Sequence, residues 1–247
     1  MKPLYIAFLF LTITISCKNE SLLSFEPIVI EEVECDTCPI VKISIPKALE
    51  DSKIDKTINT AIREEIITLL NFDESVEINT IETAISSFKN GYSDLMKKFP
   101  EESTKWEASI TGEISYEDKN VISITLNSYL FTGGAHGYSS SRFLNFNKKK
   151  GVELENWELF NPDFDFNKFA ELKFRIQEDI PQNAPINSTG FMFEEDSYNL
   201  PENIGYTKEG LQLLYNQYEI ASYADGSISL TISYPEAKKY LFIKPKL

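Results

Sequence analysis

The chain has 247 residues, with 38 acidic against 24 basic side chains, one histidine and a net charge of −14 at pH 7. This acidity disfavours nucleic acid as a ligand, because phosphate backbones are bound through clustered Lys and Arg. The 42% hydrophobic and 13% aromatic content excludes a disordered chain. It predicts a globular protein with a core large enough for one large or two small domains.

The first 16 residues have the pattern of a bacterial export signal. Lys2 precedes the apolar run Leu4–Ile15, which is too short to span a bilayer, and Cys17 follows a small residue. The end of the run is similar to a lipobox, whose cysteine is acylated and becomes the new N-terminus, although Thr14 stands where Leu is usual. We expect a signal peptide over residues 1–16 and lipidation at Cys17. Cleavage elsewhere, leaving Cys17 an ordinary residue, is the alternative.

Residues 17–34 are mixed and acidic, without helical periodicity, so we expect them to form a lipidated tether. The protein would then be exported and anchored to the bacterial outer membrane, facing either the periplasm or the cell surface. We expect membrane contact through the lipid only, and a monomer.

The cysteines beyond this point are Cys35 and Cys38, and three functions compete for their spacing. A zinc site needs four ligands, and the single histidine leaves it short of partners. A thioredoxin-type pair should open a helix, whereas Pro39 and an alternating apolar run indicate a strand after the cysteines. Because exported proteins meet oxidising conditions, a local structural disulfide is the favoured interpretation.

The body of the chain changes hydrophobic period several times. Alternation predicts a strand over 40–46, and apolar residues every three to four positions predict helices over 53–70 and 77–98. Residues 104–147 alternate again and predict an antiparallel meander. The second half predicts a helix over 166–179, a long loop, strands at 211–215 and 228–234 and a final helical turn at 236–241.

These elements predict an α+β fold of two small lobes, with helices packed on antiparallel sheet. We place the N-terminal domain at residues 35–147 and the C-terminal domain at residues 148–247.

A glycine-rich loop within the meander contains the only histidine. Gly133, Gly134, His136 and Gly137 suit either an irregular hairpin or a ligand cradle of backbone amides. The loop lacks the Lys-Ser/Thr ending of a phosphate loop. A pairing of His136 with a serine of Ser139–Ser141 is conceivable, but no nucleophile-elbow motif is present. We expect a structural histidine, no catalytic residue, no metal site and no cofactor.

Several segments resemble a pair of adjoining domains of unknown function. This pair forms the extracellular part of the lysozyme-sensing anti-sigma factor RsiV and stands ahead of the catalytic domain in the peptidoglycan deacetylase PdaC. The segments that carry the resemblance are Gly133–Gly137, Asn145–Asn147, Gly151, Trp157–Phe160 and Tyr206–Leu211, followed by Tyr215, Tyr218, Ile220, Tyr223 and Gly226.

The resemblance implies that the C-terminal lobe is similar to a subdomain of the actin and heat-shock ATPases, without their phosphate loops. It also implies that the protein binds a ligand in the envelope. The C-terminal segment that is similar to the family includes Tyr218, Tyr223 and Gly226. The leading hypothesis is a non-catalytic binding module whose ligand is a basic lysozyme-like protein or a peptidoglycan glycan. A hydrolase of envelope polymers and a purely structural lipoprotein are the alternatives.

Overall fold

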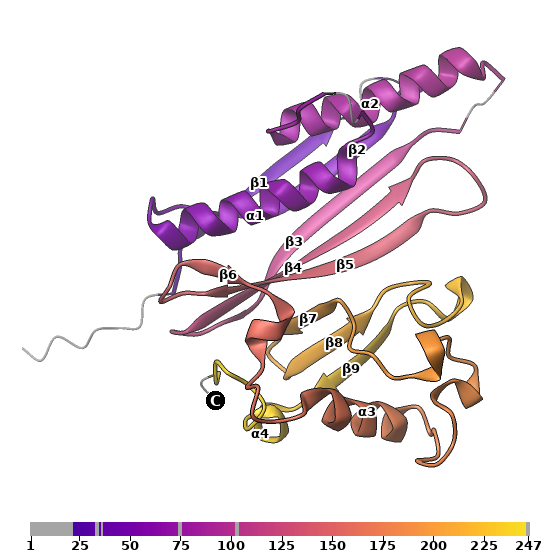
Figure 1. Cartoon of the computed structure of the whole chain (residues 1–247). Coiled ribbons are helices and arrows are strands. Elements are labelled where there is room, and N and C mark those ends of the chain that lie inside the picture. The colour runs from indigo at the N-terminus through magenta and orange to yellow at the C-terminus, as the bar shows by residue number, and fades with distance from the viewer. Residues whose placement is uncertain (1–21, 33–34, 36, 74–75, 102–103, 246–247) are drawn as a thin grey trace, which may run out of the picture.

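The computed structural model describes residues 22–32, 35, 37–73, 76–101 and 104–245. They form two lobes, each with its own sheet and hydrophobic cluster (Figure 1). The predicted signal peptide and Cys17 lie outside the described residues.

The first lobe is built on a six-stranded sheet, counted over the described residues, whose strands lie in chain order. Its strands are β1 (Phe25–Glu32), β2 (Ile40–Ala48), β3 (Glu107–Glu117), β4 (Val121–Phe131), β5 (Tyr138–Asn147) and β6 (Val152–Leu154). β2 and β3 run parallel, because the helices α1 (Lys53–Leu70) and α2 (Ile81–Lys98) cross over between them. The other neighbouring pairs are antiparallel.

The two helices cover one face of this sheet (Figure 1). α1 begins at Ser52, which forms a capping box with Asp55, and it buries an isoleucine stripe that includes Ile58, Ile62 and Ile66. α2 begins at Ile81 rather than at residue 77, because the Thr80 side chain caps the helix there. The predicted strand and helices of this lobe are otherwise confirmed.

The predicted tether over residues 17–34 is wrong for its second half. Phe25–Glu32 forms β1, an edge strand that pairs with β2 along its whole length. Pro27 and the glutamates obscured the alternation, and both are residues that edge strands favour because they discourage pairing with another chain.

The second lobe carries a three-stranded sheet, counted over the described residues, and a shorter helix. Its elements are α3 (Phe166–Gln177), β7 (Asn203–Tyr206), β8 (Leu211–Tyr215), β9 (Ile228–Ile232) and α4 (Tyr234–Ala237), with 3₁₀ helices at Asn156–Leu159, Ile186–Thr189, Glu194–Asp196 and Tyr223–Asp225. The sequence pattern did not predict β7, which is only four residues long and contains a glycine. It did not predict β6 either, which pairs with β5 across residue 147. The division between the domains at residue 147 stays a prediction.

The lobes meet where β7 lies against the outer face of β4 and β5. Buried Asn145 accepts a hydrogen bond from Ser123 Oγ and donates one to the Ile204 carbonyl, each 2.7 Å long. The α carbon of Gly205 faces the Phe143 ring so closely that an added Cβ would lie 2.1 Å from it. The second lobe is therefore fixed on the sheet by a buried polar network and a close backbone contact.

We expect Asn145→Ala to lower the free energy of unfolding by about 1 to 3 kcal/mol, because the Ile204 carbonyl and the Ser123 hydroxyl would lose a buried partner. Urea unfolding measures this change. Asn127→Ala is the matched control: Asn127 is exposed on β4, and its loss should cost less than about 0.5 kcal/mol. Equal effects of the two substitutions would contradict this account of the lobe contact.

Candidate functional site

The outer face of the meander is polar because side chains alternate along its strands. On β4, Ile122, Ile124 and Leu126 enter the core, while Asn127 and Tyr129 point outward. The neighbouring strands add serines and threonines to the same face. The second lobe covers one end of this face and leaves the rest open as a cleft between the lobes.

Two adjoining hollows make up the cleft and share Asn127 and Ser141 in their walls. The hollow nearer the glycine loop has a volume of about 430 Å³. The described residues that line it are Ser109, Thr111, Asn127, Ser128, Tyr129, Ser139, Ser140, Ser141, Asn216, Gln217, Gly226 and Ser227, and none of these carries a charge. The other hollow, of about 380 Å³, adds Glu113, Lys208 and Glu209.

Asn216 and Gln217 close the cleft from the second lobe by binding the free edge of β5. Asn216 accepts from the Ser141 N–H at 2.8 Å and donates to the Ser141 carbonyl at 3.1 Å, as a neighbouring strand would. Gln217 accepts from the Ser139 N–H at 3.3 Å. The Glu219 carboxylate holds this loop by accepting from the Asn216 N–H at 2.8 Å, and burial raises the pKa of Glu219.

The fold brings the histidine loop and the C-terminal tyrosines together at the end of the cleft. The His136 ring stacks on Tyr223 with the ring centroids 3.8 Å apart, and His136 Nε2 lies 3.4 Å from the Tyr218 hydroxyl. Tyr223 donates a hydrogen bond to the Gly137 carbonyl, and His136 Nδ1 lies 3.2 Å from the same oxygen. The two segments are more than 80 residues apart in sequence.

Tyr218 adopts a left-handed backbone conformation, with φ at +68°. This costs a bulky residue about 1 to 3 kcal/mol, and such strain gathers at functional sites. The ring is 56% exposed although it lies beside His136 and Tyr223. The surrounding loop thus holds an aromatic face in the open at a conformational cost.

The glycines of the loop have different roles. Gly133 and Gly134 have positive φ angles of 102° and 88°. Glycine adopts such angles easily and other residues do not, so the turn requires glycine at these positions. Gly137 is not in that region; its α carbon faces the Tyr129 ring, and an added Cβ would lie 2.5 Å from it. Gly226, whose φ is 73°, lines the cleft itself.

His136 has no nucleophile or carboxylate beside it among the described residues. Its ring nitrogens lie near a carbonyl and a phenol, while the nearby serines bind elsewhere: Ser140 to Ser128, and Ser141 to Asn127. Within the described part of the chain, no three His, Cys, Asp or Glu side chains are placed to hold a metal ion.

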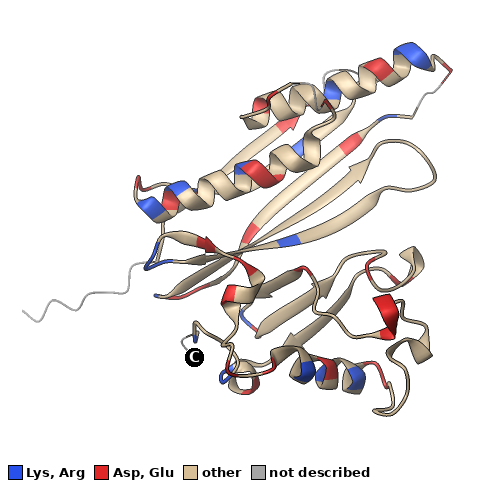
Figure 2. Cartoon of the chain, viewed as in Figure 1, with Lys and Arg blue, Asp and Glu red and all other residues tan. Residues whose placement is uncertain are grey.

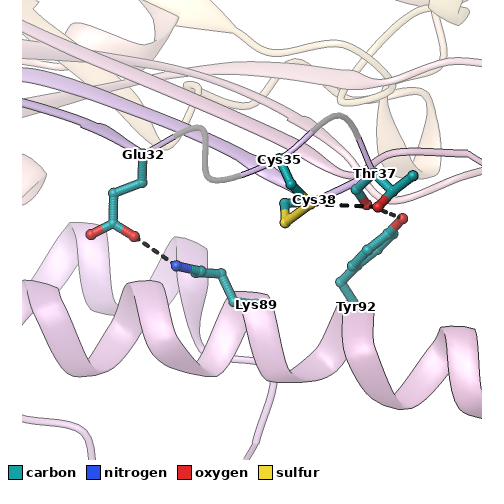
Figure 3. The surroundings of a disulfide bond; sticks show 6 residues. All are labelled: Glu32, Cys35, Thr37, Cys38, Lys89 and Tyr92. Carbon is teal, nitrogen blue, oxygen red and sulfur yellow. Dashed lines mark hydrogen bonds and ion pairs between the residues drawn. A yellow bond between two sulfur atoms is a disulfide. The ribbon is translucent and has the colours of Figure 1, made fainter.

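The predicted pair Cys35 and Cys38 is bonded in the structure, in a turn of the first lobe beside α2 (Figure 3). Two contacts from α2 hold the same turn: Tyr92 donates to the Thr37 carbonyl at 2.8 Å, and Lys89 pairs with Glu32 at 2.9 Å. The disulfide therefore closes a turn that α2 also supports.

The double variant Cys35→Ser/Cys38→Ser should lose less than about 3 kcal/mol of stability, because the stabilisation by a disulfide grows with loop length and this loop is very short. Thermal unfolding with and without reductant measures the loss. Free thiols in the oxidised protein, or zinc bound in equimolar amount, would contradict the prediction.

Comparisons with known proteins match segments of both lobes. The family model described as deacetylase PdaC matches residues 32–139, and that of the protein of unknown function DUF3298 matches residues 158–235. The chain belongs to the proteins that carry these paired domains. The resemblance noted from the sequence is thereby confirmed.

One curated relative of the paired domains is the peptidoglycan-N-acetylmuramic acid deacetylase PdaC of Bacillus subtilis, 22% identical over 129 residues. The match takes in 51% of this chain but 27% of that protein, so the chain spans about a quarter of the relative's length.

Two solved structures of DUF3298 proteins share the fold. One, from Bacteroides fragilis, is 20% identical with a TM-score of 0.70 and covers 92% of this chain and 97% of its own. The other, from Pseudomonas aeruginosa, is 18% identical with a TM-score of 0.62 and covers 90% and 95%. These similarities confirm the α+β class.

Sequence reasoning found the loop and the tyrosines but missed the cleft wall. The sequence did contain a signal for the cleft wall. The outward positions of these strands lack the charged residues that are usual on a solvated face, and hold Thr111, Asn127, Ser139 and Ser141 instead. The sequence did not predict that a second lobe covers part of this face, because that docking depends on contacts between distant segments.

Proposed function

We propose that this protein is a non-catalytic binding module of the bacterial cell envelope, and that its ligand is a cell-wall glycan held in the cleft between the lobes. The observation that carries the proposal is the hollow beside the histidine loop, which has hydroxyl and amide groups and no charge. One quarter of all residues in this chain are charged, so a wall of twelve without charge is a specific feature.

The chemistry of the cleft matches a sugar chain. Neutral hydroxyl and amide groups exchange hydrogen bonds with sugar hydroxyls and acetamido groups, and an exposed aromatic face packs against the apolar side of a sugar ring. Tyr218 follows Gln217 of the cleft wall and supplies such a face next to it, and its strained backbone is accounted for if the ring contacts the ligand.

A basic lysozyme-like protein fits the cleft less well. A basic partner would bind best to acidic side chains, because opposite charges speed the encounter of two proteins and form ion pairs between them. The acidic residues of the cleft are confined to the hollow lined by Glu113 and Glu209, where Lys208 accompanies them.

A hydrolase is the second candidate, because the curated relative is a deacetylase by name. General acid–base or nucleophilic chemistry would need a reactive partner for His136, and its ring contacts a phenol and a carbonyl instead. The relative's name also places its substrate in peptidoglycan, and this supports an envelope glycan as the ligand.

Calorimetric titration with N-acetylglucosamine oligomers and with solubilised peptidoglycan strands tests the proposal. Tyr218→Asn should weaken glycan binding at least about tenfold, as loss of a central aromatic contact does. Its melting temperature should stay the same or rise, because Asn tolerates the left-handed conformation better than Tyr.

The matched control is Phe99→Asn, which removes an equally exposed ring at the end of α2 and should leave binding unchanged. Failure of the unaltered protein to bind either glycan would reject the proposal. Release of acetate or of shorter glycans, lost in His136→Ala, would favour the hydrolase.

We also propose that the protein is exported and anchored by acylation of Cys17. Within the described residues, no helix has the length and apolar character of a membrane span. Under this proposal, Cys17→Ser should abolish labelling by a radioactive fatty acid, because the thiol is the site of acylation. Labelling that persists in the variant would contradict the anchor.

A further inference from the structure

The described chain begins at a basic end of the larger sheet. The Leu23 N–H donates to Glu117 Oε1 at 2.8 Å, and Lys148 Nζ lies 2.5 Å from the same oxygen. This ion pair is nearly buried, so it fixes the start of the described chain on the turn between β5 and β6. Blue segments stand at this end of the sheet, near β6 (Figure 2).

Exposed lysines surround this starting point. Lys149 and Lys150 follow Lys148 in the turn, Lys53 Nζ donates to the Lys150 carbonyl at 2.9 Å, and Lys244 shares a hollow with Lys149. Among the described residues, no carboxylate lies within salt-bridge distance of Lys53, Lys149, Lys150 or Lys244. In a chain of net charge −14, this is a local excess of positive charge.

Exposed aromatic rings adjoin these lysines. Trp157 is 76% exposed and Phe242 is 62% exposed, and both line a mostly apolar hollow of about 700 Å³ that Lys150 also borders. Phe242 also lines the hollow of Lys149 and Lys244, so rings and ammonium groups form one continuous surface. Glu158 and Asp165 also line the larger hollow.

We infer that this surface, formed by Lys149, Lys150, Lys244, Trp157 and Phe242, contacts an anionic phospholipid membrane. Indole and phenyl rings settle at the level of the lipid headgroups, and lysines beside them pair with phosphates. The inference departs from the expectation that only the lipid touches the membrane, and it rests on the proposed acylation of Cys17 and not on the cleft.

The length of chain ahead of the structure supports this occupant. Four residues lie between Cys17 and Leu22, so an anchored lipid lies within five residue steps, or about 17 Å, of the point where the described chain begins. That point is the basic end. Because exposed charges further apart than about 8 Å are largely screened at physiological salt, the acidic remainder of the protein does not cancel the local attraction.

The same orientation leaves the cleft accessible. Val121 of β4 lies at the basic end, paired with Asn147, and Leu130 lies at the histidine-loop end, paired with Tyr138. Nine residue steps of extended strand separate them by about 30 Å. The membrane and the glycan would therefore be bound at opposite ends of the sheet.

Vesicle co-sedimentation tests the surface without the lipid anchor. The protein would begin at Ser21, since both hydrophobic clusters consist of residues from Leu23 onward. It should bind vesicles of phosphatidylethanolamine and phosphatidylglycerol but not of phosphatidylcholine, with binding that falls as salt rises. Lys149→Glu/Lys150→Glu should weaken it about 25-fold or more, at about fivefold for each lysine near an anionic surface.

Matched controls carry the same changes elsewhere. Lys97→Glu/Lys98→Glu alters the charge equally at the end of α2, and Phe99→Ser matches Phe242→Ser, which should weaken vesicle binding about tenfold. Each variant is first checked for an unchanged melting temperature.

Equal binding by variants and controls, or no binding to anionic vesicles, would overturn the inference. So would a dimer that Phe242→Ser dissociates, because the surface would then join two copies of the chain. Glycan binding that survives all these variants keeps the cleft proposal intact, so the two proposals fail separately.

Discussion

The structure depends on how the second lobe is docked on the outer face of the first sheet. Asn145 supplies the central contact, because its side chain joins Ser123 of the sheet to the backbone of β7 at a buried position. An unpaired amide there would be costly, so the network fixes both the position and the direction of docking. The open cleft is what remains of the polar face once one end is covered.

That docking also assembles the site from segments that no local pattern connects. Asn216 continues the edge of β5, and Tyr223 stacks on His136, only because β8 and β7 are held where they are. The strained backbone of Tyr218 is maintained by the same loop. Contacts that hold this loop in place before a ligand arrives reduce the entropy lost when the ligand binds.

The sequence predicted elements well where one period persists. The isoleucine spacing of α1 and the alternation of β3 to β5 determine which side chains are buried, so their bounds were predictable to within a few residues. The edge strand β1 and the four-residue β7 were missed, because Pro27 and Gly205 interrupt patterns too short to recognise. The cleft was not predictable, since its roof and floor come from different lobes.

Hydrogen–deuterium exchange of the protein with and without solubilised peptidoglycan strands tests the central claim most directly. The account predicts slower exchange on binding in two places at once: the outer half of β5 at Ser139 to Ser141, and the loop of Asn216 to Tyr218 that closes the cleft. Protection confined to the second lobe's aromatic surface around Trp157, or no protection despite measurable binding, would contradict it.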